Sequence, residues 1–421
     1  MNKVIFHIDM DAFFVSCERG INPSLNNKPI IIARNSNRAI ITAMSYEIKN
    51  KGFKVGDPFY KVKDIFKDAL IIEPHYELYS LTSKRLFERL AYELNIEIEV
   101  YSIDECYIDV TEILEKKQIS AKIFAKQIQD FILKEFSLPC SIGISYNKFL
   151  AKMSTNKAKP FGILETKKED IEKHFYDLPV SKIFGIGKKN SIKLIDANIK
   201  TYRDLVNFDN ELLLRKILTK NYYEFIKRLK GEETKDHVFN SETKGIGNST
   251  TFEFGNSSDR TLILNTLYSV ILNVSNRAQD QNQEGNYISV LIRETNKNWI
   301  SKQFKLDHYT NDFEELKKLG FKIFLDLWDE DELIHGLGFR LSNLKKVALN
   351  YKQLNLFNES KFENKSSKII SDINNQLGLR VLKNANDLLN EKKQELHNIR
   401  FLRKTPGSQS KKINLEAKKW K

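Results

Sequence analysis

Two apolar stretches of the sequence are interrupted by acidic residues. They are VIFHIDMDAFF at residues 4–14 and YSIDECYIDV at residues 101–110, and their acids are Asp9, Asp11, Asp104, Glu105 and Asp109. Both stretches are rich in the β-branched and aromatic residues of a buried strand. A carboxylate in such a strand loses its hydration unless it is paired, hydrogen-bonded or bound to a cation, so the two stretches indicate a site for hard cations. The simpler alternative is that these acids lie at strand ends and face water.

Three of the acids are sufficient for a two-metal site. If Asp9 lies on one strand and Asp104 and Glu105 on its neighbour, the carboxylates could hold two divalent ions about 3.5 to 4 Å apart. We expect two Mg²⁺ ions, because Mg²⁺ prefers a few carboxylates together with the phosphate oxygens of a substrate. One ion would lower the pKa of an attacking 3′-hydroxyl group and the other would bind a triphosphate. Such a transfer depends mainly on position and charge, and no Cys-His or Ser-His pair in the sequence competes as a nucleophilic site.

Strand and helix patterns alternate along residues 1–165. The first predicted elements are a strand at 4–10, a helix that Asp11 caps and Gly20 ends, and a strand at 30–33. Residues 39–66 are expected to form a strand and a helix, followed by a glycine turn and a second helix. The remaining elements are an amphipathic helix at 77–95, a strand at 101–110, a helix at 119–136, a strand at 140–145, and a basic helix that Pro160 and Gly162 end. Because no glycine-rich nucleotide fingerprint occurs among them, we expect a layered mixed α/β domain rather than a dinucleotide-binding fold.

Residues 175–205 have the spacing of two short helices joined across Gly185-Ile186-Gly187, which is typical of a helix-hairpin-helix. The glycines allow backbone amides to approach a phosphate closely, and Lys188 and Lys189 begin the second helix, where the helix dipole also favours an anion. We therefore interpret Gly185, Gly187, Lys188 and Lys189 as a contact to the DNA backbone. The alternative is a loop that only turns the chain.

The C-terminal half contains a second folded unit. A polar linker at residues 232–244 precedes a βαββαβ pattern over 245–345, with strands near 246–254, 286–294, 299–305 and 333–345 and helices near 259–280 and 311–328. Residues 346–421 are polar and basic, with one predicted amphipathic helix that contains Ile369, Ile370, Ile373 and Leu377. This tail carries 17 Lys and Arg against 7 Asp and Glu, so most of the net charge of +13 lies in it. A nucleic-acid groove in the body of the protein therefore has to arise from local segregation of charge.

Length and composition limit the class of protein further. A chain of 421 residues predicts two to four domains. It has no run of eighteen apolar residues and no signal-peptide pattern, so we expect a cytoplasmic protein without a membrane span. The cysteines Cys17, Cys106 and Cys140 are far apart and form no CxxC motif, which argues against structural zinc and disulfides and predicts reduced core residues.

Four ordered segments resemble the motifs of the Y-family translesion DNA polymerases, the UmuC/DinB group. The segments are DMDAFFVSCE at 9–18, ITAMSYEIKNKGFKVG at 41–56, SIDECYIDV at 102–110 and SIGISYNKFLAKMSTNKAKPFG at 141–162. With FGIGKK and the βαββαβ unit, the resemblance covers about residues 1–345. It implies an α/β multidomain fold with a palm at 1–19 and 75–165, fingers at 20–74, a helical thumb at 166–231 with the helix-hairpin-helix, the linker at 232–244, a C-terminal βαββαβ little finger at 245–345, and the tail at 346–421.

The resemblance also implies roles for individual residues. Asp9, Asp104 and Glu105 match the metal carboxylates, with the Met10 carbonyl as a further ligand, and Phe13, Phe14, Tyr46, Lys49 and Lys159 match the nucleotide contacts. Phe14 corresponds to the aromatic steric gate that clashes with a ribose 2′-hydroxyl, whereas Asp11 and Asp109 are interpreted as a helix cap and a structural residue. The alternatives are a core role for Phe14 and a solvated helix face for the lysines.

Three positions depart from the family pattern. Lys49 stands where many members have Arg, so a single point charge replaces a bidentate phosphate clamp. Ser45 replaces a frequent Asn, and Met44 replaces a smaller residue. We expect these changes to alter the pocket for the nascent base pair and not the chemistry.

The tail contains a second recognisable segment. Gln353, Leu354, Leu356 and Phe357 follow the QLxLF pattern that resembles a sliding-clamp-binding peptide, in which the apolar residues fill a pocket of the clamp. The alternative is a local hydrophobic cluster. Residues 368–391 are similar to the tail of Gram-positive UmuC-like members and favour that branch over the DinB branch.

Taken together, the resemblance predicts a monomeric, low-fidelity polymerase without proofreading that acts in DNA repair and the SOS response. It would transfer dNMP from a dNTP to a primer 3′-hydroxyl on primer-template DNA, tethered by the sliding clamp through residues 353–357 and open to accessory proteins. Two alternatives belong to other classes: a catalytically inactive paralogue that binds clamp and DNA, and a palm-fold nucleotidyl cyclase. The first would be expected to lack a metal carboxylate, and the second would lack the hairpin and the clamp peptide.

Overall fold

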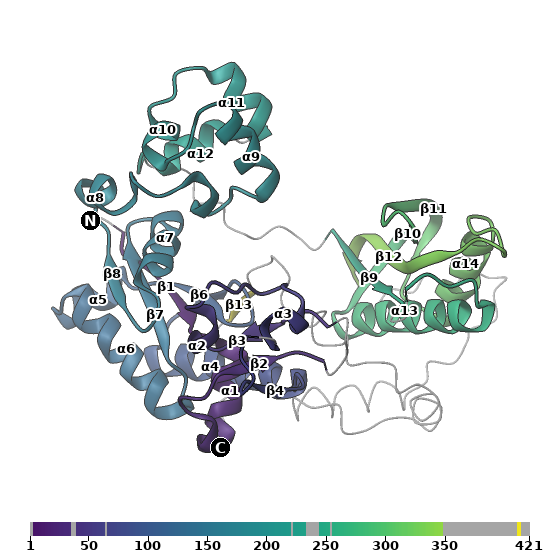
Figure 1. Cartoon of the computed structure of the whole chain (residues 1–421), viewed down its shortest axis with the longest axis horizontal. Helices are drawn as coiled ribbons and strands as arrows, with labels where there is room; N and C mark the ends of the chain where they lie inside the picture. The colour runs from purple at the N-terminus through teal and green to yellow at the C-terminus, as the bar shows by residue number, and fades with distance from the viewer. Residues whose placement is uncertain are drawn as a thin grey trace. The chain divides into compact units, whose positions relative to one another are not determined.

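The computed structural model describes residues 3–34, 39–63, 65–219, 222–232, 244–252, 255–347 and 411–413. The chain divides into two compact units, one of Met1–Asn240 with Lys404–Lys421 and one of Ser241–Arg403 (Figure 1). Each unit is described by itself below. No helix among the described residues is long and apolar enough to cross a membrane.

A six-stranded sheet forms the centre of the first unit. Its strand order is β13-β5-β6-β1-β7-β8, with bounds Lys411–Ile413, Ile98–Val100, Glu105–Asp109, Ile5–Met10, Cys140–Ser145 and Ile163–Glu165. Strand β1 is antiparallel to both of its neighbours, β6 and β7. Figure 1 shows β1 in purple beside the blue β6 and β7, although more than ninety residues of chain separate them. The two acidic stretches are therefore adjacent strands.

Helices cover both faces of this sheet, because side chains alternate along a strand. Phe6 points to one face and packs against Phe124 of α6 (Ala121–Phe136), with ring centroids 6.1 Å apart. His7 points to the other face, where its Nδ1 lies 2.9 Å from Thr155 Oγ1 on α7 (Lys148–Ala158). The close approach of α7 requires Gly143 on β7, since a Cβ atom there would lie 2.0 Å from the Ala151 carbonyl oxygen. The side of the sheet that carries His7 is thus the α7 face.

A smaller three-stranded sheet with the order β3-β2-β4 packs beside the first helices. Its strands are Ala43–Met44, Ile30–Ile32 and Leu70–Ile72, and its short helices are η1 (Pro23–Leu25), α2 (Tyr46–Lys49) and α3 (Phe59–Lys63). Helix α1 (Phe13–Ile21) packs against β2 and β3 of this sheet and against α4 (Tyr76–Leu94), whereas α5 (Thr111–Lys117) follows β6 of the large sheet. Ile31, Ile41 and Ile48 form its buried core with neighbouring apolar side chains.

A helical subdomain follows β8. Its elements are η2 (Lys168–Asp170), α8 (Ile171–Phe175), η3 (Val180–Lys182), α9 (Lys188–Asp196), α10 (Tyr202–Val206), α11 (Glu211–Leu218) and α12 (Tyr222–Leu229). Its core is built around fully buried Tyr202 and Phe175, whose rings lie 5.9 Å apart. Tyr202 also donates a hydrogen bond to the Leu229 carbonyl at 2.7 Å, which ties α10 to the end of α12.

The second unit has the predicted βαββαβ order. Its elements are β9 (Gly245–Thr251), α13 (Arg260–Asp280), β10 (Gln283–Glu294), β11 (Trp299–Thr310), α14 (Phe313–Leu325) and β12 (Ile334–Lys346), with the sheet order β11-β10-β12-β9. Ile288, Val290 and Ile292 alternate toward the helices and are buried with residues of α13 and α14. The opposite face of the sheet carries polar and basic side chains, including Arg293 and Lys305.

Several sequence predictions are confirmed and several are wrong. The fold class, the helix at 77–95, the strand at 140–145 and the three reduced, buried cysteines agree with the structure. Asp11 does not cap α1: Ala12 is the N-cap residue, with φ of 45°, and no side chain caps the helix. Gly20 lies inside α1 and does not end it, because the helix continues through Ile21.

The second acidic stretch is not one strand. Strands β5 and β6 form a hairpin in which the amides of Tyr101 and Ser102 both donate to the Glu105 carbonyl, so Asp104 lies in the turn. Likewise, the first helix of the predicted helical hairpin is only the 3₁₀ turn η3. The linker core, the clamp peptide with Gln353, Leu354, Leu356 and Phe357, and the predicted tail helix lie outside the described residues.

Candidate active site

The backbone register brings the three predicted metal carboxylates together. Asp9 on β1 is the Cα partner of Glu105 on β6, and the Met10 amide donates to the Asp104 carbonyl at 2.9 Å. Asp9 is only 2% exposed and Asp104 and Glu105 are half-buried. The alternative that these acids are solvent-facing strand ends is therefore wrong for Asp9. The sequence prediction that two distant stretches converge is confirmed.

The alternation of side chains along a strand determines which face of the sheet these acids occupy. Asp9 is two residues after His7 and therefore points to the α7 face of the sheet, as does its cross-strand partner Glu105. Two lysines of that region face them. Lys159 Nζ lies 2.6 Å from Asp9 Oδ1, and Lys152 Nζ lies 2.5 Å from Glu105 Oε2. The carboxylates thus form ion pairs with the end and the middle of α7.

Two further contacts orient the acids. His7 Nε2 is 3.5 Å from Glu105 Oε2, and the His7 ring is fully buried. The Ser102 hydroxyl donates to Asp104 Oδ1 at 2.6 Å within the hairpin turn. Each of the three carboxylates is therefore held by a named side chain.

Burial and mutual repulsion shift the proton affinities of these groups in different directions. Burial raises the pKa of Asp9, and the neighbouring Asp104 and Glu105 raise it further against the opposing charge of Lys159. Burial and then the Glu105 charge raise the pKa of Asp104. Burial alone would also raise the pKa of Glu105, but His7 and Lys152 outweigh it and the pKa is lowered. Crowded carboxylates with raised pKa values are a place where added positive charge is favourable.

The donor set fits hard divalent cations. All the candidate side-chain ligands are carboxylate oxygens, which Mg²⁺ prefers, and three acids face only two lysines. Among the described residues, no three His, Cys, Asp or Glu side chains are already arranged around one point as metal ligands. In this structure one oxygen of Glu105 and one of Asp9 are paired with Lys152 and Lys159.

Asp11 has a structural role that the sequence did not predict. It is 2% exposed and accepts hydrogen bonds from the Tyr46 hydroxyl at 3.1 Å, the Ser141 hydroxyl at 3.0 Å and the Phe161 amide at 2.7 Å. These donors come from α2, β7 and the segment after α7. Asp11 therefore joins three chain segments, whereas Asp109 has the predicted structural role and accepts from Thr111 at the start of α5.

The predicted nucleotide contacts lie around the same acids. Phe13 and Phe14 are the first two residues of α1, so their amides have no acceptor within the helix. Lys49 is exposed at the end of α2, with its Nζ 5.0 Å from the centre of the Tyr46 ring. Partial burial and the nearby Lys159 charge lower the pKa of Lys49. Lys49, Lys159 and Tyr46 thus form a basic and polar rim beside Asp9.

Phe14 is half-buried and rests on another aromatic ring. Its ring is stacked on that of Tyr79 from α4, with centroids 4.3 Å apart and an interplanar angle of 12°. The ring of Tyr76 meets Phe14 edge-on at 6.2 Å. The core alternative for Phe14 is therefore only half right, because one part of the side chain remains accessible.

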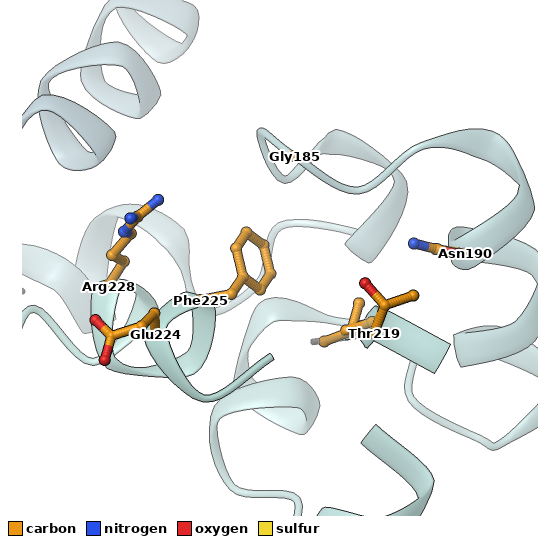
Figure 2. Close-up of a pocket in the computed structure, with 7 residues that line it drawn as sticks. Gly185, Asn190, Thr219, Glu224, Phe225 and Arg228 are labelled. Atoms are coloured by element: carbon orange, nitrogen blue, oxygen red, sulfur yellow. The ribbon is translucent and has the colours of Figure 1, made fainter. Parts of the chain in front are cut away.

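The predicted DNA contacts lie in the helical subdomain. Gly185 has a φ of 93°, and its backbone packs against the Phe225 ring, whereas the position of a Cβ on Gly187 is open space. Lys188 and Lys189 begin α9 and are exposed. A pocket of about 240 Å³ lies beside this loop and is lined by Gly185, Asn190, Leu218, Thr219, Glu224, Phe225 and Arg228. Figure 2 shows Phe225 and Arg228 of this lining near Gly185.

Sequence reasoning missed two groups of residues. Lys152 and His7 contact Glu105, and the position of Lys152 on the basic helix that precedes Lys159 was a signal that could have identified Lys152. The second group is the basic outer face of the β9–β12 sheet. It includes Arg293 on β10, Lys305 on β11 and Arg340 on β12. Strand periodicity would have shown that face once the register was known.

Comparison with known proteins agrees with this architecture. The family model described as impB/mucB/samB family matches residues 8–156, and the model of its C-terminal domain matches residues 243–356. A protein of Oceanobacillus iheyensis named DNA polymerase IV is 32% identical over 368 residues, which is 86% of each chain. A protein of the same name from Ureaplasma parvum is 32% identical and aligns with 84% of this chain and 98% of its own.

Solved structures with the same architecture are also polymerases. A Y-family DNA polymerase chimera of Dbh and Dpo4 has a TM-score of 0.71 and 26% identity, and the match covers 82% of this chain and 99% of the chimera. An insertion ternary complex of Dbh DNA polymerase has a TM-score of 0.58 and 25% identity over the same shares of the two chains. The relatives from Oceanobacillus iheyensis and Ureaplasma parvum both carry the name DNA polymerase IV, and membership of the UmuC-like branch stays a prediction. Family models, relatives and structures agree, and the chain belongs to the Y-family of DNA polymerases.

Proposed function

We propose that Asp9, Asp104 and Glu105 form the centre at which this DNA-directed, translesion DNA polymerase transfers dNMP to a primer 3′-hydroxyl. The observation that carries the proposal is the convergence of the three acids at the ends of β1 and of the β5–β6 hairpin. Phosphoryl transfer needs position and charge more than covalent chemistry, so a rigid sheet edge with acidic groups is a suitable scaffold.

Asp9, Asp104, Glu105 and the Met10 carbonyl would hold two Mg²⁺ ions, which when bound lower the pKa of the attacking hydroxyl and stabilise charge on the leaving pyrophosphate. The chain's own residues supply the remaining requirements. The β1–β6 register fixes Asp9 opposite Glu105, and Ser102 orients Asp104. Contacts with His7 and Lys152 lower the pKa of Glu105, but burial lowers the pKa of His7 itself to about 4, so Lys152 supplies the charge that balances this carboxylate.

The triphosphate would bind along the basic rim beside Asp9. Lys159 and Lys49 would contribute positive charge, Tyr46 a hydroxyl, and the first amides of α1, at Phe13 and Phe14, the donors of a helix N-terminus. Lys159 would exchange its ion pair with Asp9 for the phosphate oxygens. Lys49 acts as a point charge where an arginine would form two parallel hydrogen bonds.

Phe14 would act as the steric gate. The half-buried residue lies at the start of α1, and its ring is stacked on Tyr79. A deoxyribose would pack on the opposite face of the ring, while the additional oxygen of a ribose would collide with the ring. This geometry favours discrimination by shape, without a polar group to read the sugar.

The DNA would contact backbone groups at Gly185 and Gly187 and the charges of Lys188 and Lys189, as well as the basic outer face of the β9–β12 sheet. A clamp tether through Gln353, Leu354, Leu356 and Phe357 and a role in DNA damage tolerance complete the proposal. An inactive paralogue is disfavoured, because all three carboxylates are present and adjacent.

The test is primer extension by Asp104→Asn with and without Mg²⁺. We expect at least a ~10²-fold loss of extension, the scale of one preorganised electrostatic contact in an active site. Asp109→Asn is the matched control, because Asp109 is an exposed acid at the far end of β6. Extension by Asp104→Asn at the rate of the control variant would refute the assignment.

A further inference from the structure

A buried carboxylate that the proposed chemistry does not use lies behind Phe14. Glu18 is 3% exposed and follows Phe14 by one helical turn on α1, so the two side chains lie on the same face of the helix. Burying an ionised carboxylate costs several kcal/mol unless it is hydrogen-bonded or paired, so its position requires partners.

Both partners of Glu18 come from the start of α4. The Tyr79 hydroxyl donates to Glu18 Oε1 at 2.5 Å, and His75 Nδ1 lies 2.9 Å from the same oxygen. Tyr79 is fully buried, whereas the His75 side chain is 58% exposed. Burial and the bond to Glu18 raise the pKa of the Tyr79 hydroxyl, so it stays a protonated donor. We refer to Glu18, His75 and Tyr79 as the gate support.

The gate support fixes the plane against which Phe14 rests. The Tyr79 ring is held at its hydroxyl end by Glu18, and its face is stacked on the Phe14 ring at 4.3 Å and 12°. Tyr76, one turn before Tyr79 on α4, meets both rings edge-on at 6.2 Å. The buried and hydrogen-bonded Tyr79 ring therefore occupies the space on the α4 side of Phe14.

We propose that the gate support sets sugar selectivity, with Tyr79 as the positioning residue for Phe14 and Glu18 as the anchor of Tyr79. The inference rests on the proposed gate role of Phe14 and extends it to residues that do not touch the sugar. Without the Tyr79 ring, Phe14 can rotate into the vacated space behind it and make room for the 2′-hydroxyl. Selection of deoxyribose over ribose therefore depends on the Tyr79 ring and its hydrogen bond to Glu18 as well as on Phe14.

The experiment measures kcat/KM for a dNTP and for the matching rNTP on the same primer-template with the full-length protein. The ratio of the two values is independent of the folded fraction, because both substrates meet the same enzyme. We expect Tyr79→Leu to lower the dNTP-to-rNTP ratio about 10-fold through faster rNTP insertion, which corresponds to about 1.4 kcal/mol. The value of kcat/KM for the dNTP should change by a smaller factor than the dNTP-to-rNTP ratio.

Conservative variants separate the ring from the hydrogen bond. Glu18→Gln keeps an acceptor oxygen for Tyr79 and should retain the wild-type ratio, whereas Glu18→Leu removes the anchor and should lower the ratio toward that of Tyr79→Leu. Tyr202→Phe is the matched control, because it deletes another fully buried tyrosine hydroxyl that is bonded at 2.7 Å, far from the gate in sequence and in another subdomain. It should lower the melting temperature and leave the ratio unchanged.

Two results would overturn the inference, and a third bears on the proposed function. A wild-type ratio in Tyr79→Leu, together with a reduced ratio in Phe14→Ala, would show that the gate works without its support. A wild-type ratio in Glu18→Leu would remove the anchor role. An unchanged ratio in Phe14→Ala would instead remove the gate itself, and the inference with it.

Discussion

At the scale of the residue, the site depends on charges that are buried in pairs. Asp9 and Glu105 each contact one lysine of the α7 region, and Asp104 is held by a serine hydroxyl of its own turn. A buried ion pair contributes little net stability, but removal of one partner leaves an unpaired charge and costs several kcal/mol. Substitutions of these lysines should therefore have effects far larger than those of surface lysines.

Lys159→Ala should raise the KM for dNTP by at least ~10-fold, because truncating one partner of a close, desolvated charge pair costs about 2 to 5 kcal/mol. The measurement is single-nucleotide insertion over a range of dNTP concentrations. Lys157→Ala is the control, since Lys157 is exposed on the same helix and donates to the His174 backbone carbonyl. Equal KM values for the two variants would argue against a triphosphate contact.

Asp11 offers a second prediction at this scale, for stability rather than activity. Asp11→Asn replaces a carboxylate that accepts from Tyr46, Ser141 and Phe161 by an amide whose NH₂ group faces donors. We expect a decrease in the free energy of unfolding of about 2 to 3 kcal/mol, the range for hydrogen bonds to a charged group, and a decrease in Tm of roughly 5 to 10 °C. Thermal melting followed by circular dichroism measures it, with Asp177→Asn as the control because the Asp177 side chain is 95% exposed, and a Tm equal to that of the control would contradict the role.

At the scale of the element, short turns decide where functional groups project. The β5–β6 hairpin places Asp104 in its turn beside the end of β1, and the loop before α9 exposes Gly187 and two lysines. Backbone hydrogen bonds from Tyr101 and Ser102 to the Glu105 carbonyl close the hairpin turn, whereas the loop before α9 packs against the Phe225 ring at Gly185. A change in charge at such an element should alter binding without altering the fold.

Lys188→Ala with Lys189→Ala should weaken binding of primer-template DNA and reduce the slope of log K against log salt by about 0.9 for each phosphate that the lysines no longer neutralise. Fluorescence anisotropy at several salt concentrations gives both quantities. Lys134→Ala, an exposed lysine in the last turn of α6, is the control and should leave the slope unchanged. A wild-type slope in the double variant would leave the hairpin as a loop that only turns the chain.

At the scale of the whole molecule, the candidate functional groups are distributed over two compact units and a basic tail. The first unit contains the acids and the helical subdomain, and the second contains a sheet with helices on one face and basic residues on the other. The predicted clamp peptide at residues 353–357 lies outside the described residues of both units. Its contribution should be separable from insertion chemistry.

Leu356→Ala with Phe357→Ala in the full-length protein should abolish stimulation of primer extension by the sliding clamp and leave distributive insertion within about 2-fold, because hot-spot side chains dominate such peptide contacts. Titration of the clamp into the extension assay measures the effect. Leu388→Ala with Leu389→Ala removes an equivalent apolar pair from the same tail and should keep the stimulation. Undiminished stimulation of the first variant would place the clamp contact elsewhere.

Local patterns in the sequence were sufficient to predict many of the helices and strands and the three acidic residues of the site. Strand and helix periods, turn residues and the order of the motifs predicted the βαββαβ unit, the helix at 77–95 and the strand at 140–145, because these depend on interactions within a few residues. The acids at positions 9, 104 and 105 were identifiable for the same reason, since carboxylates interrupting an apolar strand are a local anomaly. The predicted cap at Asp11 failed because its three donors come from distant segments.

The tertiary structure alone decided the partners of these groups. Pairing of β1 with β6 and β7 determined that Asp9 and Glu105 share the α7 face, and only then do Lys152, Lys159 and His7 become their neighbours. The stack of Phe14 on Tyr79 and the burial of Glu18 likewise join two helices more than fifty residues apart. The residue types and their spacing in the sequence indicate whether a side chain is buried and needs a partner. The register of the strands and the packing of the helices determine which distant residue is that partner.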